Sequence, residues 1–257
     1  MEPSISPDAR LLGEVSVGQG TRIHPNVEVR DGSRIGDHCV IGAPAGGRWA
    51  GRPVVIGEGS VIRSHTVVYE GSSFGDRLET GHHVLIREGT QAGTNLRVGS
   101  FSDLEGDCEI GDYCRFHSYV HVGRGSRIGS FVWLYSQTTL TNDPLPPSHV
   151  SSPVTIEDGV VVCVGGIILA GARLGIGSFV ASGSRVGGCV SPGMVVDGRR
   201  GDPVAHVTAL ASLEHRIRHP WMSHFADAYP EEAQPRLQRL LEDVRASRKA
   251  PIRPKSQ

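Results

Sequence analysis

Residues 86–140 read IREGTQAGTNLRVGSFSDLEGDCEIGDYCRFHSYVHVGRGSRIGSFVWLYSQTTL, and a mostly apolar position returns every six residues along them. The residues at this position are Ile86, Ala92, Val98, Leu104, Ile110, Phe116, Val122, Ile128, Leu134 and Leu140. Glycine often follows it directly, and a small or β-branched residue stands four places later. Self-similarity at a short fixed period indicates a solenoid rather than a globular sheet.

The same phase continues on both sides of this stretch, from Val17 to Ile41, from Ile56 to Ile86 and from Ile156 to Val186, with Thr80 and Ala92 as its weak members. The apolar residue of each hexad is expected to point inward from a short strand. Glycine, Asp and Asn supply the turn conformations at the corners. Three hexads make one triangular coil, and about nine coils stacked at roughly 4.8 Å are predicted.

Two breaks interrupt the phase, at residues 42–53 and 142–153, and both are rich in Gly or Pro. They are predicted to be loops thrown out from the prism, where functional sites tend to form. The prism is assigned to residues 10–205 and a C-terminal helical extension to residues 206–257. Two or three helices are expected in the extension, and its last ten residues are expected to be disordered.

Two runs in the extension have helical spacing. The first places Leu210, Leu213 and Ile217 on one stripe within residues 207–219. The second places apolar residues on one stripe within residues 235–247, and they are Leu237, Leu240, Leu241 and Val244.

Composition restricts the class of protein. Hydrophobic residues make up 38% and aromatic residues 5% of the 257 residues, glycine is abundant at 34, and the net charge is −1. A neutral balance predicts no nucleic-acid partner. No apolar stretch is long enough for a membrane span and no signal peptide is visible, so a cytoplasmic protein is expected. The five cysteines form no C-x-x-C pair, and Cys39, Cys108 and Cys114 occupy the small inward slot as core residues.

The repeat resembles the hexapeptide-repeat acyltransferases. This resemblance implies an all-β solenoid, the left-handed parallel β-helix. It also implies a homotrimer with active sites in clefts between adjacent prisms.

Three stretches sharpen the resemblance toward the N-acetyltransferases of nucleotide-linked amino sugars. They are residues 81–123, LTNDPLPPS at 140–148, and ILAGARLGIGSFVASGSRV at 168–186 followed by VVDGRRGDPVAH at 195–206. The resemblance implies acetyl-CoA, or another short acyl-CoA, as co-substrate, a nucleotide-sugar acceptor and no metal. The closing family motif Gly-Asn-Pro-Ala-Arg is altered here to Gly201-Asp202-Pro203-Val204-Ala205, so Arg199 and Arg200 are the candidates to replace its cation, and Arg199 is assigned to the acyl-CoA site.

Acyl transfer from a thioester needs a proton acceptor for the nucleophile and donors for the developing oxyanion. His117 follows the inward Phe116 and is expected to point outward, with Tyr135 one coil above it. Asn142 opens the second loop. The resemblance assigns both His117 and Asn142 to catalysis, with His117 taking the proton and Asn142 positioning the acceptor.

Further residues are candidates for binding. The residues expected to contact the acceptor are His82, His83, Tyr119, Tyr135 and Asp143, although Asp143 is also a candidate for holding the loop. The residues expected along acyl-CoA are Cys163, Gly165, Gly166, Ala181, Arg185 and Arg199. His121, directly before the inward Val122, is a weaker candidate for the site.

Three alternatives stay open from the sequence. The stretch WAGRPVVIGEGSVIRSHTVVYEGS at 49–72 also resembles the acyl-carrier-protein-dependent O-acyltransferase that initiates lipid A, but Glu88 stands where that enzyme has its active-site histidine. A γ-carbonic-anhydrase-like zinc site would use His82, His117 and His121, whose spacing misses that family's register by one residue at each step. A non-catalytic binding module is the third.

Overall fold

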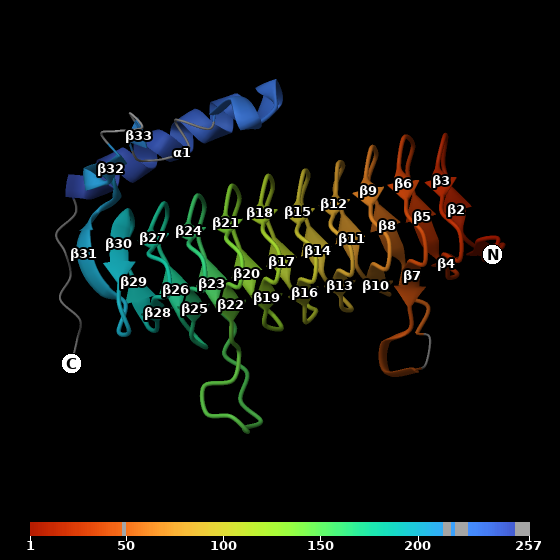
Figure 1. The fold of residues 1–257 in the computed structure, drawn as a ribbon, viewed down its shortest axis with the longest axis horizontal. Helices are drawn as coiled ribbons and strands as arrows, with labels where there is room; N and C mark the ends of the chain where they lie inside the picture. Colours follow the sequence, from red (N-terminus) through yellow and green to blue (C-terminus); the bar gives the residue numbers. More distant parts are fainter. Residues whose placement is uncertain (48–49, 213–216, 219–225, 250–257) are drawn as a thin grey trace.

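Three parallel sheets wind the chain into a long triangular prism (Figure 1). The computed structural model describes residues 1–47, 50–212, 217–218 and 226–249. Every third strand of the chain stacks in the same sheet, so that Asp103 pairs with His121 and Leu104 with Val122, eighteen residues on. The parallel β-helix with a C-terminal helical extension, expected from the six-residue repeat, is therefore confirmed.

The strands are short, and their bounds follow the hexads. Sheet A contains β1 (Ser4–Ile5), β4 (Arg22–Ile23), β7 (Val40–Ala43), β10 (Val67–Tyr69), β13 (Leu85–Ile86), β16 (Asp103–Leu104), β19 (His121–Val122), β22 (Thr139–Leu140), β25 (Ile167–Ile168) and β28 (Arg185–Val186). Sheet B contains β2 (Arg10–Leu11), β5 (Val27–Val29), β8 (Val54–Ile56), β11 (Ser73–Phe74), β14 (Gln91–Ala92), β17 (Glu109–Ile110), β20 (Arg127–Ile128), β23 (Thr155–Ile156), β26 (Arg173–Leu174) and β29 (Cys189–Val190). Sheet C contains β3 (Ser16–Val17), β6 (Arg34–Ile35), β9 (Val61–Ile62), β12 (Glu79–Thr80), β15 (Arg97–Val98), β18 (Arg115–Phe116), β21 (Trp133–Leu134), β24 (Val161–Val162), β27 (Phe179–Val180), β30 (Met194–Asp197) and β31 (Asp202–His206).

The repeating apolar residues fill the interior as predicted. Leu104, Val122 and Leu140 are fully buried, and so are Cys108 and Cys114 in the small inward slot. Burial raises the pKa of Cys108 to about 11 and that of Cys114 to about 12. Both thiols therefore stay protonated near neutral pH and act as core atoms rather than as nucleophiles.

The predicted number of about nine coils is too low, because sheets A and B each contain ten strands among the described residues. The additional coil is the first one, formed by β1, β2 and β3, and it ends at Val17. Ile5 and Leu11 stand in the same six-residue phase as Val17, but as members of the end coil they remain partly or largely exposed. Strand pairing therefore starts at Ser4, before residue 10.

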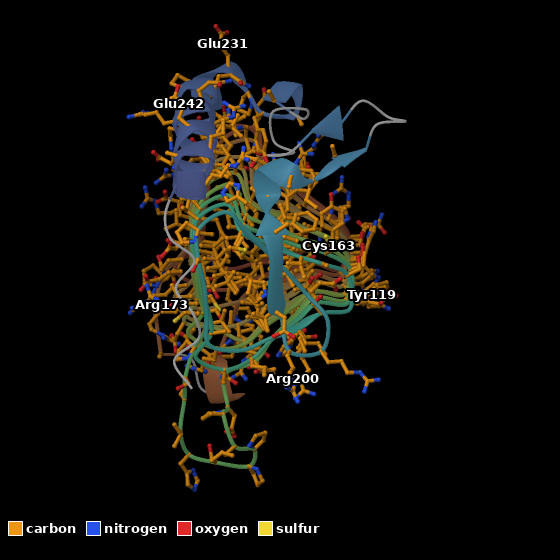
Figure 2. The ribbon with its side chains drawn as sticks, turned by 90° about the vertical axis from the view of Figure 1, so that its left-hand side faces the viewer. Tyr119, Cys163, Arg173, Arg200, Glu231 and Glu242 are labelled. Carbon is orange, nitrogen blue, oxygen red and sulfur yellow. The ribbon has the colours of Figure 1, made fainter. Side chains whose placement is uncertain are left out.

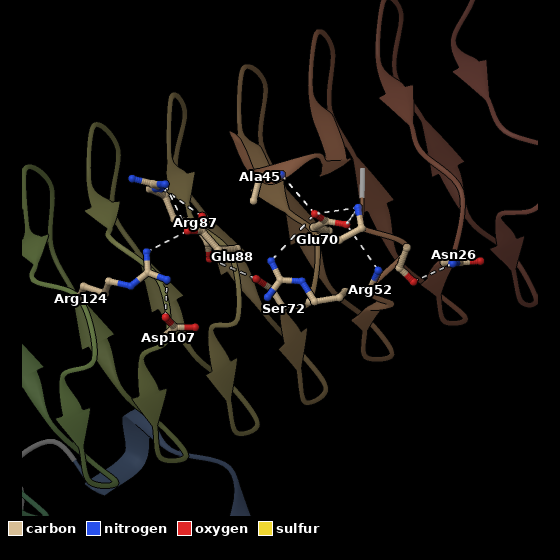
Figure 3. A network of polar contacts seen from close by, with 12 residues as sticks. Asn26, Ala45, Arg52, Glu70, Ser72, Arg87, Glu88, Asp107 and Arg124 are labelled. Carbon is tan, nitrogen blue, oxygen red and sulfur yellow. Dashed lines mark hydrogen bonds and ion pairs between the residues drawn. The ribbon is translucent and has the colours of Figure 1, made fainter. Parts of the chain in front are cut away.

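Both interruptions of the repeat leave the prism at the edge where sheet A meets sheet B, and Figure 1 shows them as long loops on one side. The first loop is held by Glu70, whose side chain is 1% exposed. Its carboxylate accepts hydrogen bonds from the backbone N–H of Ala45 at 3.3 Å and of Ala50 at 2.9 Å, and Arg52 lies 3.9 Å away (Figure 3). A buried carboxylate is stable only when paired in this way.

A second polar cluster lies on the same edge, in the three coils directly below the second loop. Glu88 is 6% exposed and accepts hydrogen bonds from Arg87 at 3.1 Å and from Arg124 at 2.8 Å (Figure 3). Arg124 also pairs with Asp107. Glu88, which stands where the lipid A enzyme has its histidine, is thus engaged by two guanidinium groups.

The extension contains one α-helix among the described residues, not two or three. Its bounds are α1 (Gln234–Ala246), and its four predicted apolar residues are buried. The described residues of the extension also form short 3-10 turns, at η2 (Val207–Ala209), η4 (Ala226–Ala228), η5 (Glu231–Ala233) and η6 (Ser247–Lys249). Another 3-10 turn, η1 (Ala45–Gly47), lies in the first loop.

The helix predicted over residues 207–219 is wrong. After η2, β32 (Ala211–Ser212) pairs antiparallel with β33 (Ile217–Arg218), while Leu213 lies outside the described residues. Three apolar residues form too short a stripe, because helical stability in proteins comes mostly from packing an apolar face. The disorder predicted for the last ten residues falls largely outside the described residues.

Tyr229 and α1 pack against the edge of the prism where sheets B and C meet. Tyr229 is 4% exposed and makes edge-to-face contacts with Tyr113 and Phe131. It also accepts a hydrogen bond from the indole N–H of Trp133. The described residues of the extension thus cover part of sheet C and do not cover sheet A. No helix within the described residues is long and apolar enough to cross a membrane.

Candidate active site

A pocket of about 630 Å³ opens on sheet A beside the second loop. It is lined by residues from five successive strands of the sheet or their ends, β16 to β28, and by residues of the loop, including His121, Asn142, Asp143 and Arg185. The inward burial of Val122 turns His121 outward, because alternate residues of a strand face opposite sides. The repeat therefore places His121 on the surface of sheet A, next to the second loop.

His121 forms a pair with Asp103, the residue directly below it in sheet A. The Nδ1 atom of His121 lies 2.9 Å from Oδ2 of Asp103, and both side chains are about one third exposed. The hydrogen bond to Asp103 raises the pKa of His121, and the charges of Asp103 and Glu105 add to this against the opposing effect of burial. His121 is therefore a stronger base than an isolated histidine, with Nε2 left for substrate.

Asn142 and Asp143 stand where the loop leaves the sheet. The carbonyl of Asn142 accepts a hydrogen bond from Ser152 N at 2.7 Å, which closes the loop at its base. The Asp143 carboxylate accepts hydrogen bonds from the backbone N–H groups of Leu145 and Ser148, both at 2.9 Å, and from the Ser148 hydroxyl. These bonds, led by that hydroxyl, lower the pKa of Asp143. Asp143 therefore holds the loop, and the Asn142 side chain lines the pocket.

Arg185 and Glu105 place opposite charges at the pocket. Arg185 lies on the same column as His121, which continues through Thr139 and Ile167. Three strand spacings separate Arg185 from His121, or about 14 Å. The pocket therefore has a positive charge from Arg185 at one end. At the other end it has His121 as a proton acceptor beside the carboxylates of Asp103 and Glu105.

His117 lies at the other edge of sheet A, where sheet C turns into sheet A, and does not line this pocket. Its ring stacks on Tyr135 with centroids 4.5 Å apart, and Trp133 lies at 6.0 Å. Burial lowers the pKa of His117. His117 and Tyr135 do stand one coil apart as predicted, but the width of sheet A separates them from Asn142 within one chain.

Two of the residues predicted along acyl-CoA continue the column of His117. Cys163 and Ala181 follow Tyr135 in register, and Figure 2 shows Cys163 and Tyr119 on the same side of the prism. Burial raises the pKa of Cys163 to about 11. Gly165 occupies a corner with a φ of 69°, whereas Gly166 is required by packing, because a Cβ there would lie 2.6 Å from Val162.

The remaining predicted residues lie elsewhere. His82 lines a groove on sheet C, and His83 and Tyr119 belong to a column of stacked rings at the edge between sheets C and A. Arg199 is exposed in the turn between β30 and β31. Arg185 is therefore the one predicted acyl-CoA residue that lines the pocket with Asn142.

The pairing of Asp103 with His121 was not recognised in the sequence. The signal was available, because the two residues are eighteen positions apart and both directly precede an inward aliphatic residue.

Within the described residues, no three His, Cys, Asp or Glu side chains are grouped so that they could hold a metal ion.

Comparison with known proteins supports the reading of the repeat. Residues 14–46 match the family model of the bacterial transferase hexapeptide, six repeats. The bifunctional protein GlmU of Shouchella clausii is 31% identical over 178 residues, which are 68% of this chain and 36% of that protein. GlmU of Mycolicibacterium smegmatis is 26% identical over 181 residues, or 70% of this chain and 35% of that protein. The chain thus spans about a third of the length of these relatives.

Among solved structures, the UDP-N-acetylglucosamine acyltransferase of Arabidopsis superimposes with a TM-score of 0.66 and 17% identity, covering 100% of this chain and 99% of that one. At this identity the likeness shows the fold alone, the left-handed parallel β-helix. The chain is accordingly a hexapeptide-repeat protein of the bacterial transferase type. The proteins that it resembles in sequence are GlmU proteins, and in fold an acyltransferase.

Proposed function

We propose that this chain is an acyltransferase that moves a short acyl group, acetyl in the simplest case, from a CoA thioester to an amine of a nucleotide-linked sugar. The observation that carries the proposal is the Asp103–His121 pair, which opens into the same pocket as Asn142 and Arg185. The protein of similar fold from Arabidopsis is a UDP-N-acetylglucosamine acyltransferase, which supports the choice of a nucleotide sugar as acceptor.

The pocket supplies the groups that the reaction needs. The acceptor amine attacks the thioester carbonyl, and Nε2 of His121 takes the proton that the nitrogen loses. Asp103 holds the Nδ1–H and stabilises the imidazolium that forms. The Asn142 amide donates to the developing oxyanion or orients the acceptor. The carbon–sulfur bond then breaks, and the thiolate leaves with a proton from His121.

The donor is proposed to be acyl-CoA, with Arg185 pairing with one of its phosphates. The residues Cys163, Gly165, Gly166 and Ala181 and the more distant Arg199 remain predicted contacts of the same donor. An acyl-carrier-protein donor and a hydroxyl acceptor are the competing possibilities, and the product of the reaction distinguishes both from the proposal.

The proposal includes assembly of the chain as a homotrimer. His117 and Asn142 lie at opposite edges of sheet A, so the two residues predicted as one site would meet only if a second copy placed its His117 edge against the sheet-A pocket. The described residues of the C-terminal extension pack at the edge between sheets B and C and against sheet C, so they leave sheet A accessible to a second copy.

The function is tested by incubating the chain with acyl-CoA donors and a panel of nucleotide-linked amino sugars, and by following the products by mass spectrometry. We expect one acceptor to gain the mass of one acyl group as an amide stable to mild hydroxylamine. A hydroxylamine-labile product would mark an ester and favour the O-acyltransferase. Transfer from acyl-carrier protein but not from CoA would contradict the proposed donor.

The pH dependence of kcat/KM should report the Asp103–His121 pair. The neutral form of His121 is the base, so the rate rises with pH through the raised pKa of His121. Removing the charge with Asp103→Asn lowers that pKa, so we expect the rising limb to move to lower pH while the plateau falls.

The matched control is Asp107→Asn, which removes a carboxylate that pairs with Arg124 and not with His121. Its pH profile should coincide with that of the unmodified chain. If neither variant shifts the rising part of the pH profile of kcat/KM, that part reflects deprotonation of the substrate amine. The role of His121 as the base is then rejected.

A further inference from the structure

A shallow groove of about 330 Å³ runs along sheet C across four successive coils and ends beside His117. Its floor is formed by Gly81 and Gly99, which stand in the same column as Arg63 and His117. Coil packing requires these glycines, because a Cβ would lie 2.3 Å from the Ser100 nitrogen at Gly81 and 2.4 Å from the His117 carbonyl carbon at Gly99. They leave the floor without side chains, so a ligand could contact the backbone.

One wall of the groove carries more positive than negative charge. Arg63 and Arg97 both pair with Glu79, at 2.8 Å and 3.2 Å. Arg63 also donates to the Thr80 carbonyl at 2.7 Å. Arg97 uses only its Nε atom in this pair, and its two terminal nitrogens have no hydrogen-bond partner among the described residues. One carboxylate thus balances two guanidinium groups that are about half exposed.

A third arginine adds to this charge from the next coil, where Arg115 stands directly beside Arg97 in sheet C. Arg115 is 7% exposed and donates to the backbone and side-chain oxygens of Asn95, both at 2.6 Å, with the Tyr229 ring 5.3 Å away. It forms no ion pair with a carboxylate of the described residues. A buried cation that contacts only neutral groups adds a positive electrostatic potential to its surroundings, because no carboxylate neutralises it and water screens it little.

The opposite wall is polar and has an aromatic rim. His82, Ser100 and Ser118 line it. The residue that follows each of them is an exposed ring in left-handed backbone conformation, at His83, Phe101 and Tyr119. Neighbouring rings stack with centroids 5.1 Å and 5.2 Å apart. Phe101 and Tyr119 are 50% and 57% exposed, and Tyr119 marks this edge in Figure 2.

We propose that the sheet-C groove binds a nucleoside diphosphate, with the phosphates against Arg63 and Arg97 and the base against the rim at Phe101 and Tyr119. Guanidinium groups with free N–H donors suit phosphate oxygens, and an exposed ring suits a planar base. The choice of ligand rests on the proposed function, in which both the acceptor and CoA contain a nucleoside diphosphate. The binding itself does not require turnover.

The test is isothermal titration calorimetry of the full chain with UDP, CoA and inorganic pyrophosphate, each without a co-substrate. Arg97→Gln removes one positive charge together with the two unpaired terminal nitrogens, and it should weaken UDP binding about tenfold or more. Glu79→Gln removes the opposing charge and should tighten UDP and pyrophosphate binding, which a folding defect cannot imitate. Tyr119→Ala should weaken UDP binding and leave pyrophosphate binding unchanged.

The control is Arg127→Gln, which alters an exposed arginine paired with Glu109 on sheet B, 3.7 Å away. It should bind all three ligands as the unmodified chain does. If CoA rather than UDP loses affinity in Arg97→Gln, the groove holds the donor and its assignment to the acceptor is overturned. Equal affinity of Arg97→Gln and the unmodified chain for all three ligands would overturn the groove itself. Lost turnover with intact UDP binding would instead count against the proposed reaction.

Discussion

Replacing His121 by alanine should lower kcat by a factor of about 10² to 10⁴, the usual contribution of a positioned general base. The expected loss follows from the pairing of His121 with Asp103 inside the pocket that Asn142 lines. KM should change little, because a base acts mainly on the transition state. Single-turnover kinetics with a saturating acyl donor would measure the effect on the chemical step alone, and added imidazole should restore part of the rate.

His117→Ala provides the comparison, because His117 is also a surface histidine that follows the same repeat. Its ring stacks on Tyr135 and lies outside the pocket, so we expect its replacement to raise KM and to leave kcat within about tenfold. The reverse result, with kcat collapsing in His117→Ala and persisting in His121→Ala, would return the catalytic role to His117.

Tyr229→Ala should destabilise the docking of the C-terminal extension by about 3–5 kcal/mol, as expected for removing a buried aromatic side chain. Tyr229 packs edge-on against Tyr113 and Phe131. The change also removes the acceptor for the Trp133 indole and the ring beside Arg115. Hydrogen exchange over residues 226–249 should become faster, while exchange in the inner strands of the prism stays slow, because contacts in a solenoid are local.

Tyr229→Phe is the matched control, since it keeps the ring and removes only the hydroxyl. It should cost about 1 kcal/mol, the net value of one hydrogen bond. If Tyr229→Ala leaves exchange over residues 226–249 as slow as in the unmodified chain, the extension is held by α1 alone and Tyr229 is not its anchor.

The six-residue repeat predicted most of the prism because the same local rule, an apolar residue pointing inward followed by a turn, applies to every hexad. Val122 and Leu140 point inward for the same reason as Leu104, so one phase determined which side chains are buried and which are exposed. The same phase placed His121 and His117 at the surface and both loops outside the prism. The end coil was missed, since only two hexads precede Val17 and neither Ile5 nor Leu11 is directly followed by the glycine that often marks the repeat.

The extension shows where a sequence pattern becomes insufficient. Leu237, Leu240, Leu241 and Val244 form a full stripe and do lie on a buried helix face. Residues 207–212 have a shorter stripe, and their structure depends on Val207 packing into the cluster around Tyr229, a contact that joins distant segments.

The sequence by itself determined the coil, its three faces, the buried cysteines and the positions of the loops, because these follow from a period of six residues. Only the tertiary structure decided which outward residues share a site. Asp103 and His121 meet because consecutive coils stack in register, whereas His117 and Asn142 are separated by the width of sheet A. Stacking places residues eighteen apart side by side, and it places residues at different corners of a coil on different edges of the prism.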